Sequence, residues 1–132
     1  MRFLFASALA LAGLSFAVAD GADGFIIQIG TSVPCSRKTK KGDKIAVNYN
    51  GTFTNYQVFD SSYPASGPPS PFVFKIGSGP VIKGWQLGLL DMCVGDIRKI
   101  FVPPAFGYGN NTVGNIPANT LLLYYVELVQ RY

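Results

Sequence analysis

The chain has 132 residues, of which 48% are hydrophobic and 14% are charged, and its formal net charge is +4. This composition excludes a disordered chain, and so small a charge gives no case for nucleic-acid binding. The sequence has no histidine and only two cysteines, which excludes a Cys/His zinc site, a Ser-His-Asp triad and a Cys-His dyad. The 15 glycines and 9 prolines indicate many turns and little helix.

The first residues have the pattern of a removable leader. A positive start at Met1-Arg2 precedes an apolar run over residues 3–18, and Ala17-Val18-Ala19 is a small-x-small cleavage signal. We expect a signal peptide at residues 1–19, an N-terminal segment at 20–29 and a single domain at 30–132. The alternative is an uncleaved membrane anchor, but the run is short for a span.

The compartment follows from the leader and from the other end of the chain. Val129-Gln130-Arg131-Tyr132 is not a Lys/His-Asp-Glu-Leu retrieval signal. We therefore expect the endoplasmic reticulum lumen or secretion from the cell, with no membrane attachment of the mature form.

Two sequence features have a particular meaning in that compartment. Cys35 and Cys93 are expected to be oxidised there, and the favoured state is one internal disulfide. Two buried free thiols or an intermolecular bridge remain alternatives. Asn50 and Asn110 each begin an Asn-x-Thr sequon and are glycosylation candidates. Asn110 is the better candidate because it lies in a polar loop, whereas Asn50 follows a strand.

The first half of the chain predicts strands and one proline-rich loop. Residues 25–29 form a short apolar run. Residues 44–50 alternate, with Ile45, Val47 and Tyr49 on one face of a half-buried strand. A turn at Asn55-Tyr56 leads into residues 57–60. The segment 63–71 contains four prolines and must be a loop.

The second half predicts the helix and the remaining strands. Residues 72–76 alternate as a strand, and residues 83–92 have helical spacing of Trp85, Leu89 and Met92. Residues 97–102 form a strand whose buried face is ambiguous, and 103–119 form a long loop. The last strand, 120–131, places four residues on one face: Leu122, Tyr124, Val126 and Leu128. Together these elements predict an α+β fold, in which an antiparallel sheet of four to six strands wraps around one short α-helix.

The polar residues offer little reactive chemistry. Only Asp60 of the seven acidic residues lies in an aromatic setting, and it has no partner carboxylate such as a glycosidase needs. Residues 77–80 lack the lysine of a phosphate-binding loop. We expect no metal and no cofactor. What remains is a set of rings, which form either the core or an apolar ligand cup: Tyr49, Phe59, Phe72, Phe74, Trp85, Tyr108 and Tyr124.

A series of short motifs occurs in one order along the chain. They are Val47-Asn48-Tyr49-Asn50-Gly51, Phe59-Asp60-Ser61-Ser62, Pro71-Phe72, Val81-Ile82-Lys83-Gly84-Trp85, Gly88, Met92, Gly95, Tyr108-Gly109, Ile116-Pro117 and Val126-Glu127-Leu128. In this order and spacing the chain resembles the FKBP-type peptidyl-prolyl cis–trans isomerases from about residue 30 to 132. The leader and the cysteine pair resemble the small secretory-pathway members, in which the two cysteines form a disulfide.

The resemblance implies an FKBP-like fold and a role for each matching residue. Trp85 would be the floor of a proline pocket, and the hydroxyl of Tyr108 and the N–H of Ile82 would bind ligand carbonyls, with Asp60 as an acceptor at the rim. The walls would be Tyr49, Phe59, Phe72, Val81, Ile82 and Ile116. Tyr124 stands where the family usually has phenylalanine, so its hydroxyl must find a partner or water. The implied catalytic group is Tyr49, Phe59, Asp60, Trp85 and Tyr108, and the implied ligand-binding group is Phe72, Val81, Ile82, Ile116 and Tyr124.

The implied activity is rotation about Xaa-Pro bonds during protein folding. The expected partners are proline-containing unfolded or nascent polypeptides and macrolides of the tacrolimus and rapamycin type, with no nucleic acid, and the expected state is a monomer. Two other functions stay open at this point. One is a non-catalytic proline-binding or chaperone module on the same fold, and the other is an unrelated secreted β-rich protein that binds carbohydrate with exposed rings.

Overall fold

The computed structural model describes residues 16–18 and 24–132, and most of this part of the chain belongs to one antiparallel sheet. Its strands are β1 (Phe16–Val18), β2 (Ile26–Thr31), β3 (Lys44–Thr52), β4 (Val58–Ser61), β5 (Phe72–Lys75), β6 (Ile97–Val102) and β7 (Leu122–Arg131). The helices in the same residues are α2 (Lys83–Gly88) and a short 3₁₀ helix, η2 (Pro104–Phe106). Strands β2 to β7 make the six strands at the upper end of the predicted range, and β1 adds a seventh at the edge.

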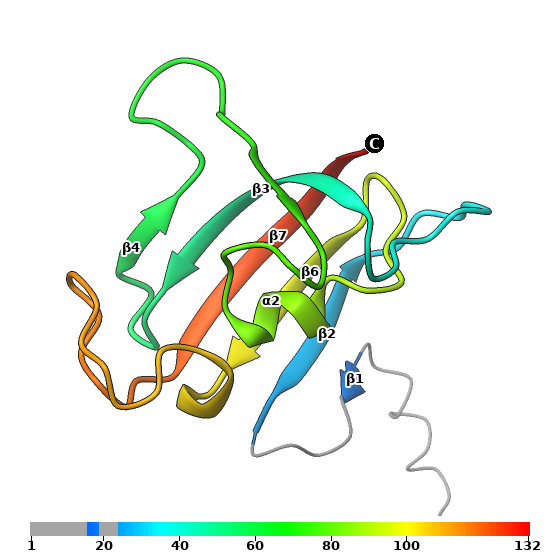
Figure 1. Cartoon of the computed structure of the whole chain (residues 1–132). Helices are drawn as coiled ribbons and strands as arrows, with labels where there is room; N and C mark the ends of the chain where they lie inside the picture. Colours follow the sequence, from blue (N-terminus) through cyan, green and yellow to red (C-terminus); the bar gives the residue numbers. More distant parts are fainter. Residues whose placement is uncertain (1–15, 19–23) are drawn as a thin grey trace, which may run out of the picture.

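The order of the strands brings distant segments together. Hydrogen-bonded neighbours follow the order β1-β2-β6-β7-β3-β4, and β5 also pairs with β3. The long strand β3 pairs with β5 through residues 44–47 and with β4 through residues 50–52, while β7 lies along its other edge. Figure 1 shows α2 against one face of the curved sheet. The predicted α+β fold class is confirmed.

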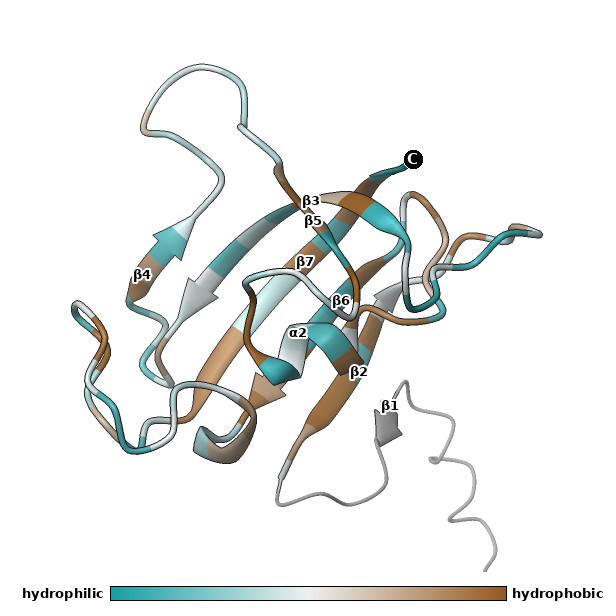
Figure 2. Ribbon diagram, viewed as in Figure 1, coloured by the Kyte–Doolittle hydropathy of each residue, from teal (hydrophilic) through white to brown (hydrophobic). Residues whose placement is uncertain are grey.

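The face of the sheet toward α2 is the hydrophobic core. Ile45 and Val47 of β3 are fully buried, as the alternation of that strand predicted. Leu122, Val126 and Leu128 of β7 are also fully buried, and Figure 2 shows hydrophobic residues concentrated in the strands. The structure also resolves the ambiguous strand β6, because its even-numbered residues, Arg98, Ile100 and Val102, are the buried ones.

Two glycines let α2 pack directly on β6. A Cβ atom at Gly84 would lie 2.9 Å from Val102 Cγ1, and one at Gly88 would lie 2.8 Å from Ile100 Cδ1. Real Cβ atoms essentially never make contacts this short, so a side chain at either position would force the neighbouring residue to shift, whereas glycine allows the close approach of helix and strand. The close approach fixes the depth at which Trp85, between the two glycines, sits above the sheet.

The helix is shorter than predicted, because it ends at Gly88 and not at Met92. Arg98 supplies the reason, since its guanidinium donates to the backbone oxygens of Gly88 (2.8 Å), Leu90 (2.6 Å) and Asp91 (3.1 Å). These donors satisfy carbonyls that a continuing helix would have satisfied with its own N–H groups. Asp91 then turns the chain with a φ of 61°.

The segment before β3 is fastened to the turn after α2. Cys35 and Cys93 form a disulfide, which confirms the favoured sequence prediction. Thr39 is buried nearby, where its hydroxyl donates to Leu89 O (2.6 Å) and accepts from Met92 N (2.9 Å). Asp96 joins the same two segments, because its carboxylate accepts from Val33 N (2.6 Å) and Cys93 N (3.0 Å).

The expected leader, residues 1–19, lies outside the described residues except for 16–18. Those three residues form β1, which pairs with β2. Part of the expected N-terminal segment belongs to the sheet, since β2 begins at Ile26 and the Phe25 ring stacks on Phe106 with centroids 4.9 Å apart. Within the part of the chain that the structure describes, no helix has the length and apolar character to span a membrane.

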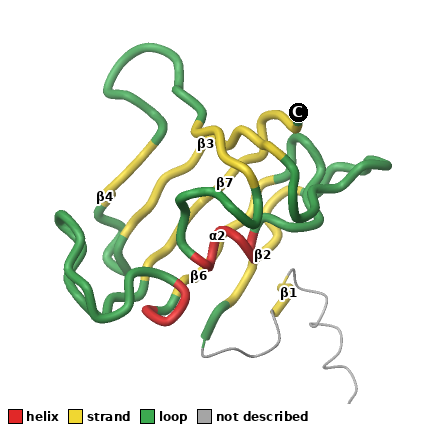
Figure 3. The backbone as a smooth tube through the Cα atoms, in the orientation of Figure 1, coloured by secondary structure: helices red, strands yellow, loops and turns green. Residues whose placement is uncertain are grey.

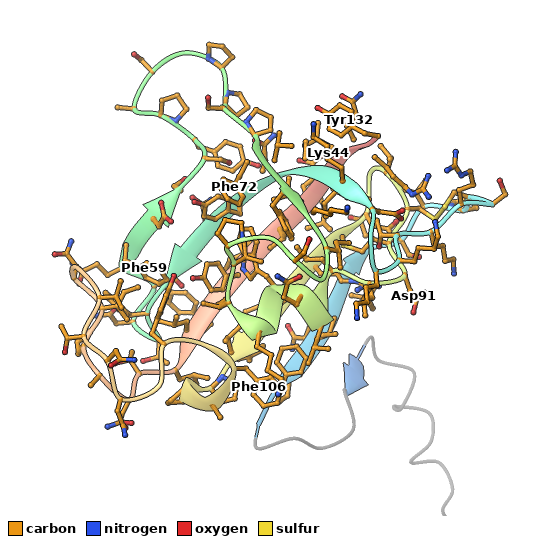
Figure 4. All side chains as sticks on the ribbon, in the orientation of Figure 1. Lys44, Phe59, Phe72, Asp91, Phe106 and Tyr132 are labelled. Carbon is orange, nitrogen blue, oxygen red and sulfur yellow. A yellow bond between two sulfur atoms is a disulfide. The ribbon has the colours of Figure 1, made fainter. Side chains whose placement is uncertain are left out.

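A buried carboxylate holds the C-terminal end of the sheet. Asp43 accepts from Arg131 Nε (2.8 Å) and from Lys40 N (2.9 Å), and these partners lower the pKa of Asp43 from 3.8 to about 2, the hydrogen bond from Arg131 being the largest cause. Beyond it, the Lys44 ammonium lies over the Tyr132 ring, 5.3 Å from its centroid (Figure 4). The ionised form of Asp43 therefore favours the folded state.

This arrangement predicts a loss of stability in acid. A carboxylate with a lowered folded pKa stabilises the fold above its unfolded pKa of 3.8, and the contribution disappears as the pH falls through about 2. We expect Asp43→Asn to have a lower free energy of unfolding than wild type at pH 7 and to lose the difference in the acid range. Urea unfolding across the pH range measures this. A difference that stays constant with pH would contradict it.

Candidate functional site

Trp85 lies at the centre of a group of rings. It is 4% exposed, and its position follows from the helix start, where Trp85 N donates to Ile82 O (3.0 Å). The Tyr49 ring meets the indole edge-on, with centroids 4.9 Å apart and planes at 83°, and Tyr124 does the same at 5.3 Å and 81°. The Phe74 ring also packs against the indole, with centroids 5.7 Å apart. The edge-to-face contacts hold the indole in one orientation.

The turn before α2 is fixed above the helix by one side chain. The carboxamide of Gln86 accepts from Gly77 N and donates to Gly79 O (3.1 Å). Both bonds run from α2 back to the turn, so they set the position of the residues that follow it, Pro80, Val81 and Ile82. These three residues form one side of a hollow above the indole.

This hollow has a volume of about 140 Å³ and opens to the solvent. Its lining residues come from strands β3, β4, β5 and β7, from α2 and the turn before it, and from the loop after η2. Eight of the ten site residues expected from the sequence line it: Tyr49, Asp60, Phe72, Val81, Ile82, Trp85, Tyr108 and Tyr124. Pro80 also lines the hollow, although the sequence analysis did not include it among the site residues. Its position directly before Val81 could have identified it. The hollow is not filled by the protein's own side chains, and the indole faces it.

The other two expected residues, Phe59 and Ile116, lie next to this hollow and not in it. They line a neighbouring hollow of about 320 Å³, and Asp60 and Tyr108 line both. Phe59 contacts the wall of the first hollow, because its ring packs edge-on against the lining residue Tyr124 with centroids 5.7 Å apart. Ile116 is 7% exposed and reaches this position because it pairs with Val113 in a tight bridge. Figure 3 shows this segment within the long connection between η2 and β7.

Polar groups gather on one side of the hollow. Tyr49 Oη donates to Asp60 Oδ2 (2.8 Å), and Asp60 Oδ1 accepts from Ser61 N (2.9 Å). Burial is the main cause that raises the pKa of Tyr49 above its usual value, and the bond to Asp60 adds to it. Burial likewise raises the pKa of Tyr124, with a smaller effect of nearby Tyr108. Both phenols therefore lose their protons only at a higher pH than an ordinary tyrosine does.

The floor itself is buried. Trp85 Nε1 is buried and has no hydrogen-bond partner among the described residues. The described residues also contain no group of three or more histidine, cysteine, aspartate or glutamate side chains that could hold a metal ion. The site therefore presents ring faces and a few hydroxyl, carboxylate and amide groups at its edge.

The proline-rich loop lies beside the site without lining it. Residues 63–71 are all exposed, and Ser70 N donates to Ser62 O (2.9 Å) at the base of the loop. Figure 1 shows the loop projecting beyond β4 and β5, and Figure 4 shows Phe59 and Phe72 on that side of the molecule, away from Asp91.

The two glycosylation candidates lie in different surroundings. Asn110 is exposed in the loop after Tyr108. Asn50 lies inside β3, where it pairs with Ser61 of β4 and Tyr125 of β7, and its side chain accepts a hydrogen bond from Ser61 Oγ. A residue in the middle of a sheet is a poor acceptor for a glycan, which argues against Asn50.

The structure is thus an antiparallel sheet curved around one short helix, with a ring-lined hollow over a tryptophan. Comparison with known proteins identifies the class further. Residues 35–129 match the family model of the FKBP-type peptidyl-prolyl cis-trans isomerases. The chain belongs to this family.

Named relatives agree with this assignment. FK506-binding protein 2 of Podospora anserina is 50% identical over 108 residues, which are 81% of this chain and 57% of that protein. FK506-binding protein 2 of Dictyostelium discoideum is 47% identical over 125 residues, which are 92% and 90% of the two chains. The chain thus spans little more than half of the first relative and most of the second. The crystal structure of AtFKBP13 has a TM-score of 0.74 and 31% identity, covering 89% of this chain and 98% of that one.

Proposed function

We propose that the hollow over Trp85 is the active site for rotation about Xaa-Pro bonds in unfolded and nascent polypeptides of the secretory pathway. The observation that carries this proposal is the open, ring-lined cavity of about 140 Å³ directly above the indole. Pockets for drug-sized ligands are typically about 300–1,000 Å³, so a hollow this small suits the ring of a single residue. Family membership supports the same activity.

The reaction needs no reactive side chain. Amide resonance sets a rotation barrier of about 18–20 kcal/mol, and the twisted transition state loses this resonance together with part of the carbonyl polarity. Water therefore stabilises the planar ground state more than the twisted one. A hollow that replaces water by ring faces lowers the barrier, and about 4 kcal/mol of preferential stabilisation gives a thousandfold acceleration.

The polar edge of the hollow would hold the substrate chain on either side of the proline. The hydroxyl of Tyr108 and the N–H of Ile82 would donate to substrate carbonyls, and Asp60 would accept at the rim. The bond from Tyr49 to Asp60 (2.8 Å) fixes the carboxylate in place. The adjoining hollow lined by Phe59 and Ile116 would receive the part of the ligand beyond the proline ring.

The remaining parts of the proposal concern partners and location. Macrolides of the tacrolimus type would compete with peptides for this hollow, since several relatives carry the name FK506-binding protein. The leader expected at residues 1–19 and the disulfide both support a location in the secretory pathway. The proposed working state there is a monomer. Asn110, exposed in its loop, would be the glycan acceptor.

Removal of the Tyr108 hydroxyl tests this site. A single hydrogen bond to the substrate is worth about 1–1.5 kcal/mol, so Tyr108→Phe is expected to lower kcat/KM by about tenfold in a proline-peptide isomerisation assay. Tyr125→Phe is the matched control, because it deletes the same group from the opposite face of β7, where Tyr125 is exposed. The proposal is wrong if Tyr108→Phe is as active as this control.

A further inference from the structure

We propose that Gln86 is a positioning residue for this reaction. Its carboxamide fixes the turn at residues 77–79, and through that turn it holds the side chain of Val81 and the N–H of Ile82 in place for the bound peptide. The inference rests on the proposed function of the hollow, and it assigns a role to a side chain that does not itself line the hollow.

The Gln86 side chain binds two backbone groups of the turn at once. Gln86 is half-buried in α2, its Oε1 accepts a hydrogen bond from Gly77 N, and its Nε2 donates one to Gly79 O at 3.1 Å. A carboxamide carries an acceptor and a donor side by side, so one side chain meets both groups. The turn is therefore fastened to the helix at two points.

The turn needs this support because of its composition. Gly77 has a φ of 97°, a left-handed conformation that glycine adopts without strain, and Gly79 follows two residues later. Glycine loses more conformational freedom on ordering than any other residue. Gly79 N donates to Lys75 O (2.9 Å), and the two bonds from Gln86 complete the ordering of the segment.

The residues after the turn have few hydrogen bonds of their own. Pro80 has no N–H, and no hydrogen bond from the N–H of Val81 or Ile82 is found among the described residues. At its far end this segment is fixed by Ile82 O, which accepts from Trp85 N (3.0 Å) and from Gln86 N (3.2 Å). Its near end depends on the turn that the Gln86 side chain holds.

Gln86 thus joins one wall of the hollow to its floor. Trp85, the floor, directly precedes Gln86 on α2, while Val81 and Ile82 form part of the wall. A hydrogen-bond donor that is already aimed at the substrate carbonyl lowers the barrier more than one that must first be ordered. Loss of the carboxamide would leave the floor in place and free the wall to move.

Gln86→Met in the full chain tests this role. Methionine is also unbranched and has a similar helix propensity, but it replaces both hydrogen-bonding groups. We expect kcat/KM per folded molecule to fall about fivefold in a proline-peptide isomerisation assay. The amide order parameters of Val81 and Ile82, measured by ¹⁵N relaxation, should fall as well, while that of Trp85 stays as in wild type.

Two further variants make the comparison sharper. Gln86→Glu keeps the acceptor for Gly77 N and loses the donor to Gly79 O at neutral pH, so its loss should be smaller, about twofold. Gln130→Met is the matched control, because Gln130 is exposed near the end of β7, and it should leave kcat/KM unchanged. Urea unfolding of each variant establishes that the rates compare folded proteins.

The outcomes separate this inference from the function on which it rests. With an active wild type, a folded Gln86→Met protein as active as Gln130→Met overturns the role of Gln86 alone. A loss of activity without a change at Val81 and Ile82 overturns it too, as does a larger loss in Gln86→Glu than in Gln86→Met. A wild type that does not accelerate isomerisation overturns the proposed function itself.

Discussion

Replacement of Trp85 by alanine is expected to lower kcat/KM by about a hundredfold, which corresponds to about 2.7 kcal/mol of lost transition-state stabilisation. The indole is the floor of the hollow and the surface on which Tyr49, Phe74 and Tyr124 pack. Without the indole, water would enter beneath a bound prolyl ring. The hollow would then no longer stabilise the twisted transition state in preference to the planar ground state. A proline-peptide isomerisation assay measures the loss.

A graded series separates this effect from unfolding, because removal of a buried tryptophan also costs stability, by about 3–5 kcal/mol. Trp85→Phe retains an aromatic floor and should lose about tenfold in kcat/KM or less. Rates are compared only under conditions where urea unfolding shows both variants folded. Activity of a folded Trp85→Ala protein within about threefold of wild type would remove the indole from the mechanism.

Loss of the disulfide is expected to produce a large change in stability and little change in activity. The bond closes a sequence separation of 58 residues, and in the chain-entropy model its removal costs roughly 4 kcal/mol. Cys35→Ala combined with Cys93→Ala should therefore lower the free energy of unfolding by about that amount. Neither cysteine lines the hollow. The isomerisation rate per folded molecule should consequently stay within about twofold of wild type.

The structure explains why the fold should survive this change. Thr39 still bonds to Leu89 and Met92, and Asp96 still bonds to Val33 and Cys93 through backbone groups. Equal urea midpoints for the double variant and wild type would show that the bond does not stabilise the protein. A rate that falls in the folded double variant would show that the turn after α2 influences the site.

The sequence correctly predicted the features that depend on a local pattern, such as the buried faces of two strands. Alternation in residues 44–50 identified Ile45 and Val47 as core, and the same pattern identified the buried face of β7. In both strands the residues that belong to the main core cluster lie on one face, so the period of two is visible in the residues themselves. The family motifs predicted ten site residues, and eight of them line one hollow in the structure.

The errors arose where distant residues decide the outcome. The apolar spacing of Leu89 and Met92 continued past Gly88, and both side chains are indeed buried, but Arg98 on β6 satisfies the carbonyls there and ends the helix. Phe59 lines the neighbouring hollow, and its ring lies close to Gly51, where a Cβ atom would be 2.9 Å from Phe59 Cζ. Neither contact leaves a local pattern in the sequence.

The position of a bound proline ring is the most direct test of the account as a whole. A nuclear Overhauser experiment on the protein with a bound Xaa-Pro peptide should show contacts between the proline ring protons and the indole protons of Trp85. It should show none to Tyr125 on the opposite face of the sheet. Proline contacts at Tyr125 without contacts at Trp85 would place the substrate elsewhere and contradict the account.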